Sequence, residues 1–324
     1  MTDEQEDPRE VEWHPRFAQR VVGHDAALLQ FEKAFASGRP HHAWLIYGGK
    51  GIGKATLAYV LAKRVLGQGN AEQSSRWIDA KAHPDLFVLE RQLNDSKPRK
   101  LKAEISVDDA RGLAKFLART ASGWRVVIVD AADDLNMESG NAILKLVEEP
   151  PAKTLLLLLS HQPGRLLRTL KSRCLRLGLT PLAPQQTFSI INSLPLDSKP
   201  PIEDLDRAVD QSNGCPGQAL ALLNSQGAKT FAQFIKLHNP KLSEHLGIAN
   251  ALSGRAVGPE EFPIFTDLLL NWIAAQAAER SSAALAKAHE QISEASRIVV
   301  GFNLDRKQAV MSQLKLVNDA LKAS

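Results

Sequence analysis

The chain of 324 residues contains little cysteine, with Cys174 and Cys215 as its two examples. Their spacing matches neither a CxxC pair nor the disulfide framework of a small secreted domain. A zinc site built from several thiolates is excluded for the same reason. We therefore expect a reduced, cytoplasmic protein without bound zinc, in which both cysteines are inert packing residues.

Long apolar runs are also missing. The longest, residues 155–159 and 268–270, are far too short to span a bilayer. Residues 2–12 are polar, carry six carboxylates and lack the basic and then apolar pattern of a signal peptide. We expect residues 1–20 to form a mostly disordered tail and the protein to have no membrane segment.

No strong charge excess points to a ligand. The net charge of +4 arises from 40 basic and 36 acidic residues, and 44% of the residues are hydrophobic. These values are typical of a globular protein with a mixed surface, and they neither require nor exclude contact with nucleic acid. The length allows two or three domains.

Buried strands and amphipathic helices alternate up to about residue 179. Because the strands are almost continuously apolar, they predict a largely parallel sheet covered by helices. After residue 179 the strand pattern stops, and three short helices are expected in 180–225, around a loop at 194–201. Residues 226–324 are helical throughout in pattern. The expected strands are 43–47, 85–89, 125–130 and 154–159, and the expected helices include 55–66 and 139–148.

A phosphate-binding loop follows the first expected strand. Gly48, Gly51 and Gly53 precede Lys54, and a helix begins there. Glycines let backbone N–H groups approach phosphate oxygens, while the lysine and the helix N-terminus supply positive charge. The alternative is a glycine-rich turn that serves only the strand-to-helix connection.

This loop lacks two groups that ATP hydrolysis requires. Ala55 stands where a Ser or Thr hydroxyl binds Mg²⁺, and Thr56 points about 100° away around the helix. Asp130 ends the third strand at the position of a Walker B aspartate, but Ala131 replaces the glutamate that orients water. We expect Gly48, Gly51, Gly53, Lys54 and Asp130 to form a degenerate nucleotide site. Hydrolysis should be negligible, and weak ATP binding remains open.

Residues 130–151, DAADDLNMESGNAILKLVEEPP, resemble the corresponding segment of clamp-loader ATPases of the AAA+ class. The resemblance extends to residues 171–174, similar to the Ser-Arg-Cys motif, and to 214–220, similar to the helix that carries sensor 2. It implies an AAA+ domain at 21–179, a helical lid at 180–225 and a helical collar domain for oligomerisation at 226–324.

Within this family, the degenerate site favours the delta-prime branch over the ATP-hydrolysing gamma/tau subunits. Gly217 stands where an active subunit has its sensor 2 arginine. One departure concerns residues 67–84, which contain none of the zinc-binding cysteines that many family members carry there. The alternative is a self-sufficient, gamma/tau-like ATPase, but an intact Ser or Thr at 55, Glu at 131 and Arg at 217 are missing.

The resemblance also assigns roles to single residues. Arg173 is implied to be an arginine finger that acts in trans on ATP held by an adjacent subunit; the alternative is a surface arginine. Ser160 occupies the sensor 1 position, with a relic role favoured. His41 and His42 either border an adenine pocket or are structural. The basic segment 97–102 is expected to be a solvated loop.

These implications define an expected function. The chain would have no catalysis of its own, would require no cofactor, and would belong to a DNA polymerase III holoenzyme. Its expected partners are gamma/tau and delta subunits, the sliding clamp, and primed DNA through the assembled complex.

Overall fold

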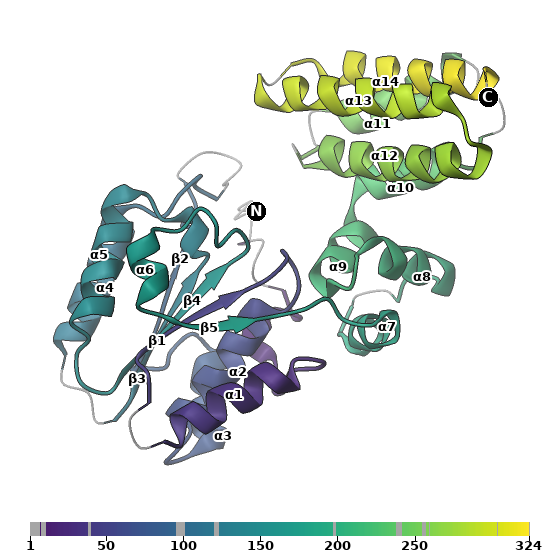
Figure 1. The fold of residues 1–324 in the computed structure, drawn as a ribbon. Coiled ribbons are helices and arrows are strands. Elements are labelled where there is room, and N and C mark those ends of the chain that lie inside the picture. The colour runs from purple at the N-terminus through teal and green to yellow at the C-terminus, as the bar shows by residue number, and fades with distance from the viewer. Residues whose placement is uncertain are drawn as a thin grey trace, which may run out of the picture. The chain divides into compact units, whose positions relative to one another are not determined.

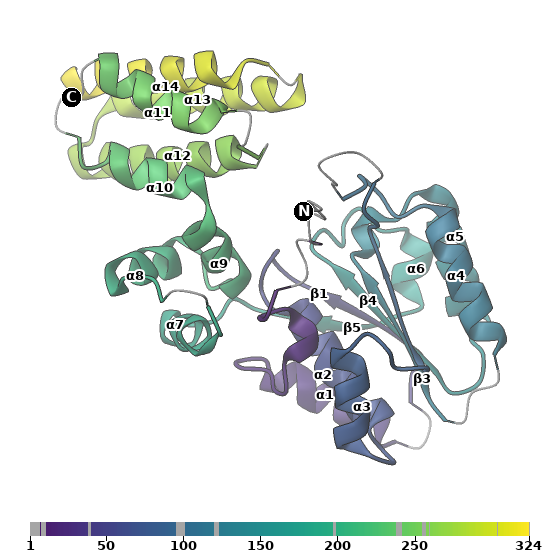
Figure 2. The ribbon, with the colours of Figure 1, turned by 180° about the vertical axis from the view of Figure 1, so that it is seen from behind.

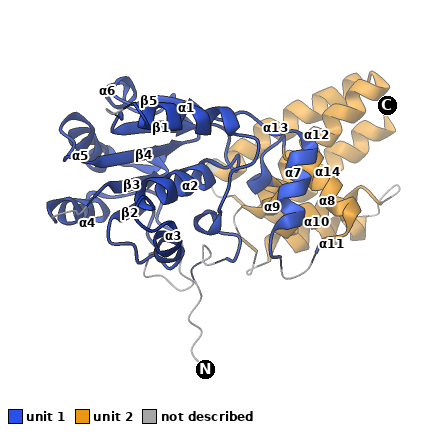
Figure 3. Ribbon diagram, turned by 90° about the horizontal axis from the view of Figure 1, so that it is seen from below, with its two compact units in different colours: residues 1–199, 213–218 blue, residues 200–212, 219–324 orange. Residues whose placement is uncertain are grey.

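The computed structural model describes residues 7, 11–37, 40–94, 101–119, 123–196, 199–237, 242–254, 257–258, 260–302 and 304–323. The chain divides into two compact units (Figure 3). The first comprises residues 1–199 and 213–218, and the second comprises 200–212 and 219–324. Parts of the predicted tail 1–20, of the basic segment 97–102 and of the loop 194–201 lie outside the described residues.

The first unit contains a five-stranded parallel sheet with the order β2-β3-β4-β1-β5 (Figure 1). The four predicted strands are confirmed, with β2 shifted by one residue and β4 longer by one residue, and residues 175–178 form a fifth strand. A fully parallel sheet with its longest strands in the middle explains the continuous apolar runs in the sequence. The strands are β1 (Ala43–Tyr47), β2 (Leu86–Glu90), β3 (Arg125–Asp130), β4 (Thr154–Ser160) and β5 (Leu175–Gly178).

Helices cover both faces of this sheet (Figures 1 and 2). Successive side chains of a strand point to opposite faces, so that each strand contributes to two separate cores. On one face lie α1 (Asp25–Phe35), α2 (Lys54–Leu66) and α3 (Ala71–Asp79), and on the other lie α4 (Val107–Ala118), α5 (Met137–Glu148) and α6 (Arg168–Ser172).

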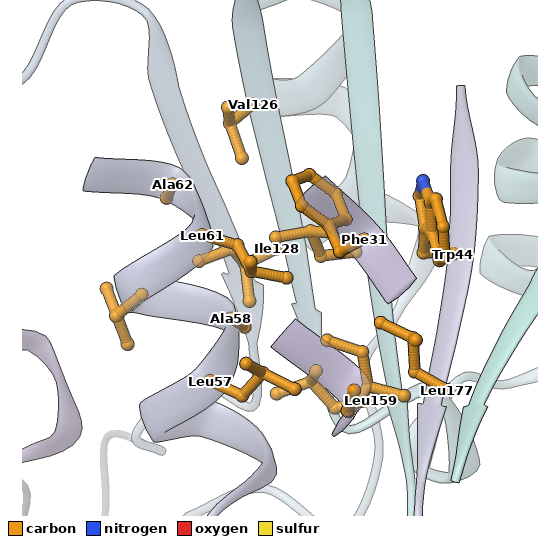
Figure 4. Close-up of a cluster of buried hydrophobic side chains, with 14 of the residues drawn as sticks. Phe31, Trp44, Leu57, Ala58, Leu61, Ala62, Val126, Ile128, Leu159 and Leu177 are labelled. Atoms are coloured by element: carbon orange, nitrogen blue, oxygen red, sulfur yellow. The ribbon is translucent and has the colours of Figure 1, made fainter. Parts of the chain in front are cut away.

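The core under α2 confirms the helix predicted for residues 55–66. Leu57 and Leu61, which Figure 4 shows, form its buried stripe together with Val65. Opposite them, Phe31 and Trp44 pack with ring centroids 5.1 Å apart. Burial of these side chains fixes the helix that starts directly after the phosphate-binding loop, and thereby the position of the loop.

Helix α5 begins two residues earlier than predicted. The Asn136 side chain accepts a hydrogen bond from the backbone N–H of Ser139 at 3.0 Å and caps the helix. Ile143 and Val147 are buried against the sheet, as their spacing predicts. A side-chain cap thus sets the start of α5, and core packing sets which face of the helix is buried.

The predicted helices after residue 179 are confirmed. The helical core of the second unit includes a buried polar cluster, in which Gln313 Nε2 donates to Thr266 Oγ1 at 3.1 Å and to Ser296 Oγ at 3.0 Å. Within the described residues, no helix is both long and apolar enough to cross a membrane. The helices are α7 (Pro184–Ser193), α8 (Ile202–Gln211), α9 (Pro216–Asn224), α10 (Gln226–Phe234), α11 (Leu242–Ser253), α12 (Glu261–Arg280), α13 (Ala283–Gly301) and α14 (Arg306–Lys322).

The described part of the N-terminal segment differs from the expected disorder. Residues Pro15–Phe17 form a short 3-10 helix, and Arg16 is buried. The Arg16 Nε–H donates to the carbonyl of Asp79 at 3.0 Å. The prediction rested on the polar composition of residues 2–12, which carries no information about this contact with a residue 63 positions away.

Candidate functional site

The phosphate-binding loop joins β1 to α2, as the sequence predicts. Gly51 and Gly53 have positive φ angles of 78° and 108°, which side chains rarely adopt, and Gly53 occupies the N-cap of α2. Gly48 follows β1 directly and hydrogen-bonds through its N–H to the Ser160 carbonyl. The structure thus brings the three glycines together with Lys54 at the carboxyl edge of the sheet.

Lys54 is directed onto its own loop. Its buried ammonium donates to the Gly48 carbonyl at 2.9 Å and to the Gly49 carbonyl at 2.8 Å. Burial lowers the pKa of Lys54, and the Asp130 and Asp133 carboxylates nearby oppose that effect. In this arrangement two loop carbonyls accept the hydrogen bonds that phosphate oxygens would accept from the lysine in a loaded site.

Protein atoms also contact the loop from two other segments. The Gly217 N–H donates to the Gly51 carbonyl at 2.8 Å, and the His24 Nε2–H donates to the Ile52 carbonyl at 2.9 Å. A β-carbon at Gly217 would lie 2.8 Å from Gly51 Cα, so only glycine fits there. The segment at the sensor 2 position therefore packs directly on the loop.

Asp130 lies at the end of β3, beside Glu90 of β2. Burial, with the Glu90 carboxylate nearby, raises the pKa of Asp130 to about 6, and Lys54 opposes this shift. Ala55 and Ala131 place methyl groups where a hydroxyl and a second carboxylate would stand. Of the neighbouring positions 130 and 131, only the first thus carries a carboxylate, and this carboxylate titrates below neutral pH.

Arg173 lies where the strands begin, at the end of the sheet opposite the phosphate-binding loop. It follows α6 and precedes β5, with its side chain 42% exposed. The strand register pairs Trp44 with Leu175 and Tyr47 with Gly178, which puts Arg173 level with residue 42. From there to Gly48 the parallel strands extend over six residues, or about 20 Å. Arg173 is therefore not brought together with the loop of its own chain.

Comparisons with known proteins show which family the chain resembles. Residues 23–183 match the model of the family described as DNA polymerase III, delta subunit. The chain is 37% identical over 198 residues to the DNA polymerase III subunit delta' of Pseudomonas aeruginosa, covering 58% of this chain and 57% of that protein. It is 35% identical over 225 residues to subunit delta' of Escherichia coli, covering 65% and 64%. The chain belongs to the delta-prime family.

The alignments thus span about three fifths of each of these two delta-prime relatives. Among solved structures, a DNA polymerase III gamma subunit-related protein of Thermotoga maritima has a TM-score of 0.54 at 16% identity, covering 91% of this chain and 99% of that one. This likeness confirms the AAA+ fold, with a parallel sheet followed by helical regions.

Asp133 is a residue of this delta-prime family member that the sequence did not single out. Its buried carboxylate accepts hydrogen bonds from Ser160 Oγ at 2.8 Å and from the N–H of His161 at 2.7 Å. The Ser160 hydroxyl, at the sensor 1 position, thus donates its hydrogen bond to a carboxylate of the same chain. Its place three residues after Asp130, in a run of acidic residues, was the available signal.

Glu148 is the second residue that was missed. Its Oε1 lies 3.0 Å from Arg173 Nη2. It is the last residue of α5, and Glu149 follows it. Two carboxylates at the negative end of a helix dipole are unfavourable, and this was a signal that one of them has a partner elsewhere.

The two neighbouring histidines have structural contacts. His41 Nδ1 hydrogen-bonds with the Ala43 carbonyl at 2.9 Å, and the His42 Nε2–H donates to the Val147 carbonyl at 2.8 Å. Their rings stack with centroids 4.8 Å apart. These contacts favour the structural interpretation over a border of an adenine pocket.

Proposed function

We propose that this chain is a non-hydrolysing subunit of the DNA polymerase III clamp loader. It supplies Arg173 to ATP held by an adjacent gamma/tau subunit, and thereby helps to load the sliding clamp onto primed DNA in the cytoplasm. It assembles with gamma/tau and delta subunits through its C-terminal helices, residues 226–324. This proposal follows from membership of the delta-prime family and from the position of Arg173.

The separation of Arg173 from its own loop is the observation that carries the proposal. The two lie on opposite edges of one parallel sheet, about 20 Å apart along the strands. An arginine side chain is much shorter than this distance. An exposed guanidinium at that edge is available only to a phosphate group bound outside the chain.

The loop itself supports the absence of hydrolysis. Loss of a general base typically lowers the rate by about 10²–10⁴, and Ala131 carries no base. Ala55 adds the loss of a Mg²⁺ ligand. For ATP to bind, Lys54 must first leave the Gly48 and Gly49 carbonyls. We therefore propose that no cofactor is required, that ATP binds weakly if it binds, and that the chain holds no zinc.

The test is Arg173→Ala in a complex reconstituted with gamma/tau and delta subunits. An arginine finger contributes about 10³–10⁵ to a phosphoryl transfer, but only one site in the assembly borders this subunit. Bulk ATP hydrolysis should therefore fall partially, and clamp loading, which needs the sites to act together, should fall more. Arg173→Lys should rescue poorly, because an ammonium lacks the planar fork.

Arg168→Ala is the matched control, because Arg168 is an exposed arginine at the start of the same short helix. It should load clamps like the wild type. Size-exclusion chromatography of each complex separates a loss of assembly from a loss of rate. If Arg173→Ala supports wild-type loading at saturating ATP, the assignment of the finger is wrong.

A further inference from the structure

The guanidinium of Arg173 is held by two groups of its own chain. Nη2 lies 3.0 Å from Oε1 of Glu148, and Nη1 donates to the Thr169 carbonyl at 3.1 Å. The first group belongs to α5 and the second to α6. Arginine has five N–H donors, so three remain for a further ligand.

The position of Glu148 adds little to the stability of the folded state. A carboxylate at the C-terminus of a helix interacts unfavourably with the helix dipole. The ion pair with Arg173 joins side chains that are 40% and 42% exposed. Such exposed pairs stabilise the folded state by a small free energy, similar in size to the unfavourable interaction with the helix dipole. Because the two effects nearly cancel, the contribution of the pair to folding does not explain why this carboxylate lies beside Arg173.

Both ends of the pair are attached to well-fixed backbone. On α5, Val147 is buried and its carbonyl accepts the hydrogen bond from His42. Around Arg173, Leu170 and Cys174 are buried in the same core. The carboxylate and the guanidinium are thus presented by elements whose packing leaves them little freedom.

We propose that Glu148 is the positioning residue for Arg173. It restricts the long, flexible arginine to orientations in which its remaining N–H groups face a nucleoside triphosphate bound by the neighbouring subunit. Ordering such a side chain in advance removes an entropic cost from the step in which it meets the phosphate. This inference rests on the proposed function of Arg173.

The experiment compares Glu148→Ala, Glu148→Gln and the control Glu149→Ala in the reconstituted complex. Glu149 is exposed and carries the same charge at the next position of the chain. Ordering one side chain corresponds to a factor of about 2–12. Clamp loading at saturating ATP should fall by about that factor in Glu148→Ala and by less in Glu148→Gln, which keeps an acceptor oxygen. The ATP concentration for half-maximal loading should not change, because the partner binds the nucleotide.

The double variant Glu148→Ala/Arg173→Ala separates positioning from a general structural effect. It should load clamps no more slowly than Arg173→Ala alone, because Glu148 acts only through Arg173. An equal loss in both backgrounds would overturn the inference, and so would a Glu148→Ala complex that behaves like Glu149→Ala. Faster loading by Glu148→Ala would also overturn it, showing that the carboxylate competes with the phosphate.

The outcomes distinguish this inference from the proposed function. If Arg173→Ala itself loads normally, the proposed function fails. If Arg173→Ala is impaired while Glu148→Ala is not, the finger stands and the positioning role fails. Melting temperatures and size-exclusion profiles establish that each variant is folded and assembled. If the Glu148→Ala complex does not assemble, the rate of the Glu148→Gln complex decides between the two outcomes.

Discussion

Asp130 illustrates at the scale of one residue how the surroundings of a carboxylate decide its protonation. A carboxylate at the end of this strand normally faces Mg²⁺, whose charge favours the ionised form. Here burial and Glu90 act in the opposite direction and raise its pKa to about 6. Lys54 and Arg91 oppose this shift, and Lys54 is itself hydrogen-bonded to the loop.

Asp130→Asn should therefore stabilise the protein at neutral pH. The folded-state pKa of about 6 exceeds the ordinary value of 3.8, so the folded state binds more protons between these values. The free energy of unfolding of the wild type consequently falls as pH rises through this window and levels off above it. The variant should be more stable at pH 7.5 by on the order of 2 kcal/mol, with the difference vanishing near pH 4.

Urea unfolding of both proteins between pH 4 and pH 8 measures this difference. A variant that is less stable than the wild type at pH 7.5 would show that Asp130 contributes a needed charge, as it would in a working metal site.

Helix α3 shows at the scale of an element what residues 67–84 form without zinc-binding cysteines. Ile78 is buried in the core shared with α2, and Ser74 Oγ donates to the Leu66 carbonyl at 3.0 Å. Lys63 Nζ lies 2.7 Å from Asp79 Oδ1. Apolar packing, a hydrogen bond and an ion pair attach this segment to α2.

We predict that this segment needs packing and no metal. Elemental analysis should find no stoichiometric zinc, and chelators should leave the melting temperature unchanged. Ile78→Ala, in contrast, should lower the free energy of unfolding by about 2–5 kcal/mol, because it leaves a cavity in the core. Zinc bound at one per chain would show that histidines and carboxylates form a site, and this prediction would be wrong.

The sequence predicted these elements well where the pattern is local. Residues that are close in the chain determine strand β1, the phosphate-binding loop and the buried face of α2 that includes Leu57. The pairing of Glu148 with Arg173 does not, because it depends on how α5 and α6 pack against the sheet. The position of Arg16 could not be predicted either, because it depends on a hydrogen bond to residue 79, which is far away in the sequence.

At the scale of the whole molecule, the change from strand to helix patterns near residue 179 predicted an α/β domain followed by helical regions, and the resemblance of residues 130–151 to clamp-loader ATPases added the AAA+ class. The sequence also showed that Ala55 replaces the Ser or Thr expected after Lys54, and that Ala131 replaces the Glu expected after Asp130. What the sequence did not contain was the contact of Gly51 with Gly217, which are 166 positions apart. Such a contact is determined by tertiary packing, and its one sign in the sequence is that both positions are glycine.

The isolated chain should accordingly have no ATPase activity above background, even with DNA and clamp present. Two groups of phosphoryl-transfer chemistry are missing at Ala55 and Ala131, and a third at Gly217. A steady-state assay with the full chain measures this directly. Turnover of about 1 s⁻¹ that disappears in Lys54→Ala would contradict the prediction.

The Gly51–Gly217 contact also limits which side chains the phosphate-binding loop can accept beside it. An arginine at 217 places its β-carbon 2.8 Å from Gly51 Cα and 3.1 Å from the Gly51 carbonyl oxygen. The change that restores one missing group thus disrupts the loop that the other two changes need. We expect Ala55→Thr/Ala131→Glu/Gly217→Arg to melt at a lower temperature than Ala55→Thr/Ala131→Glu, and neither to turn over ATP. We therefore expect that supplying all three side chains together does not turn this chain into an ATPase, because the third one displaces the loop on which the other two act.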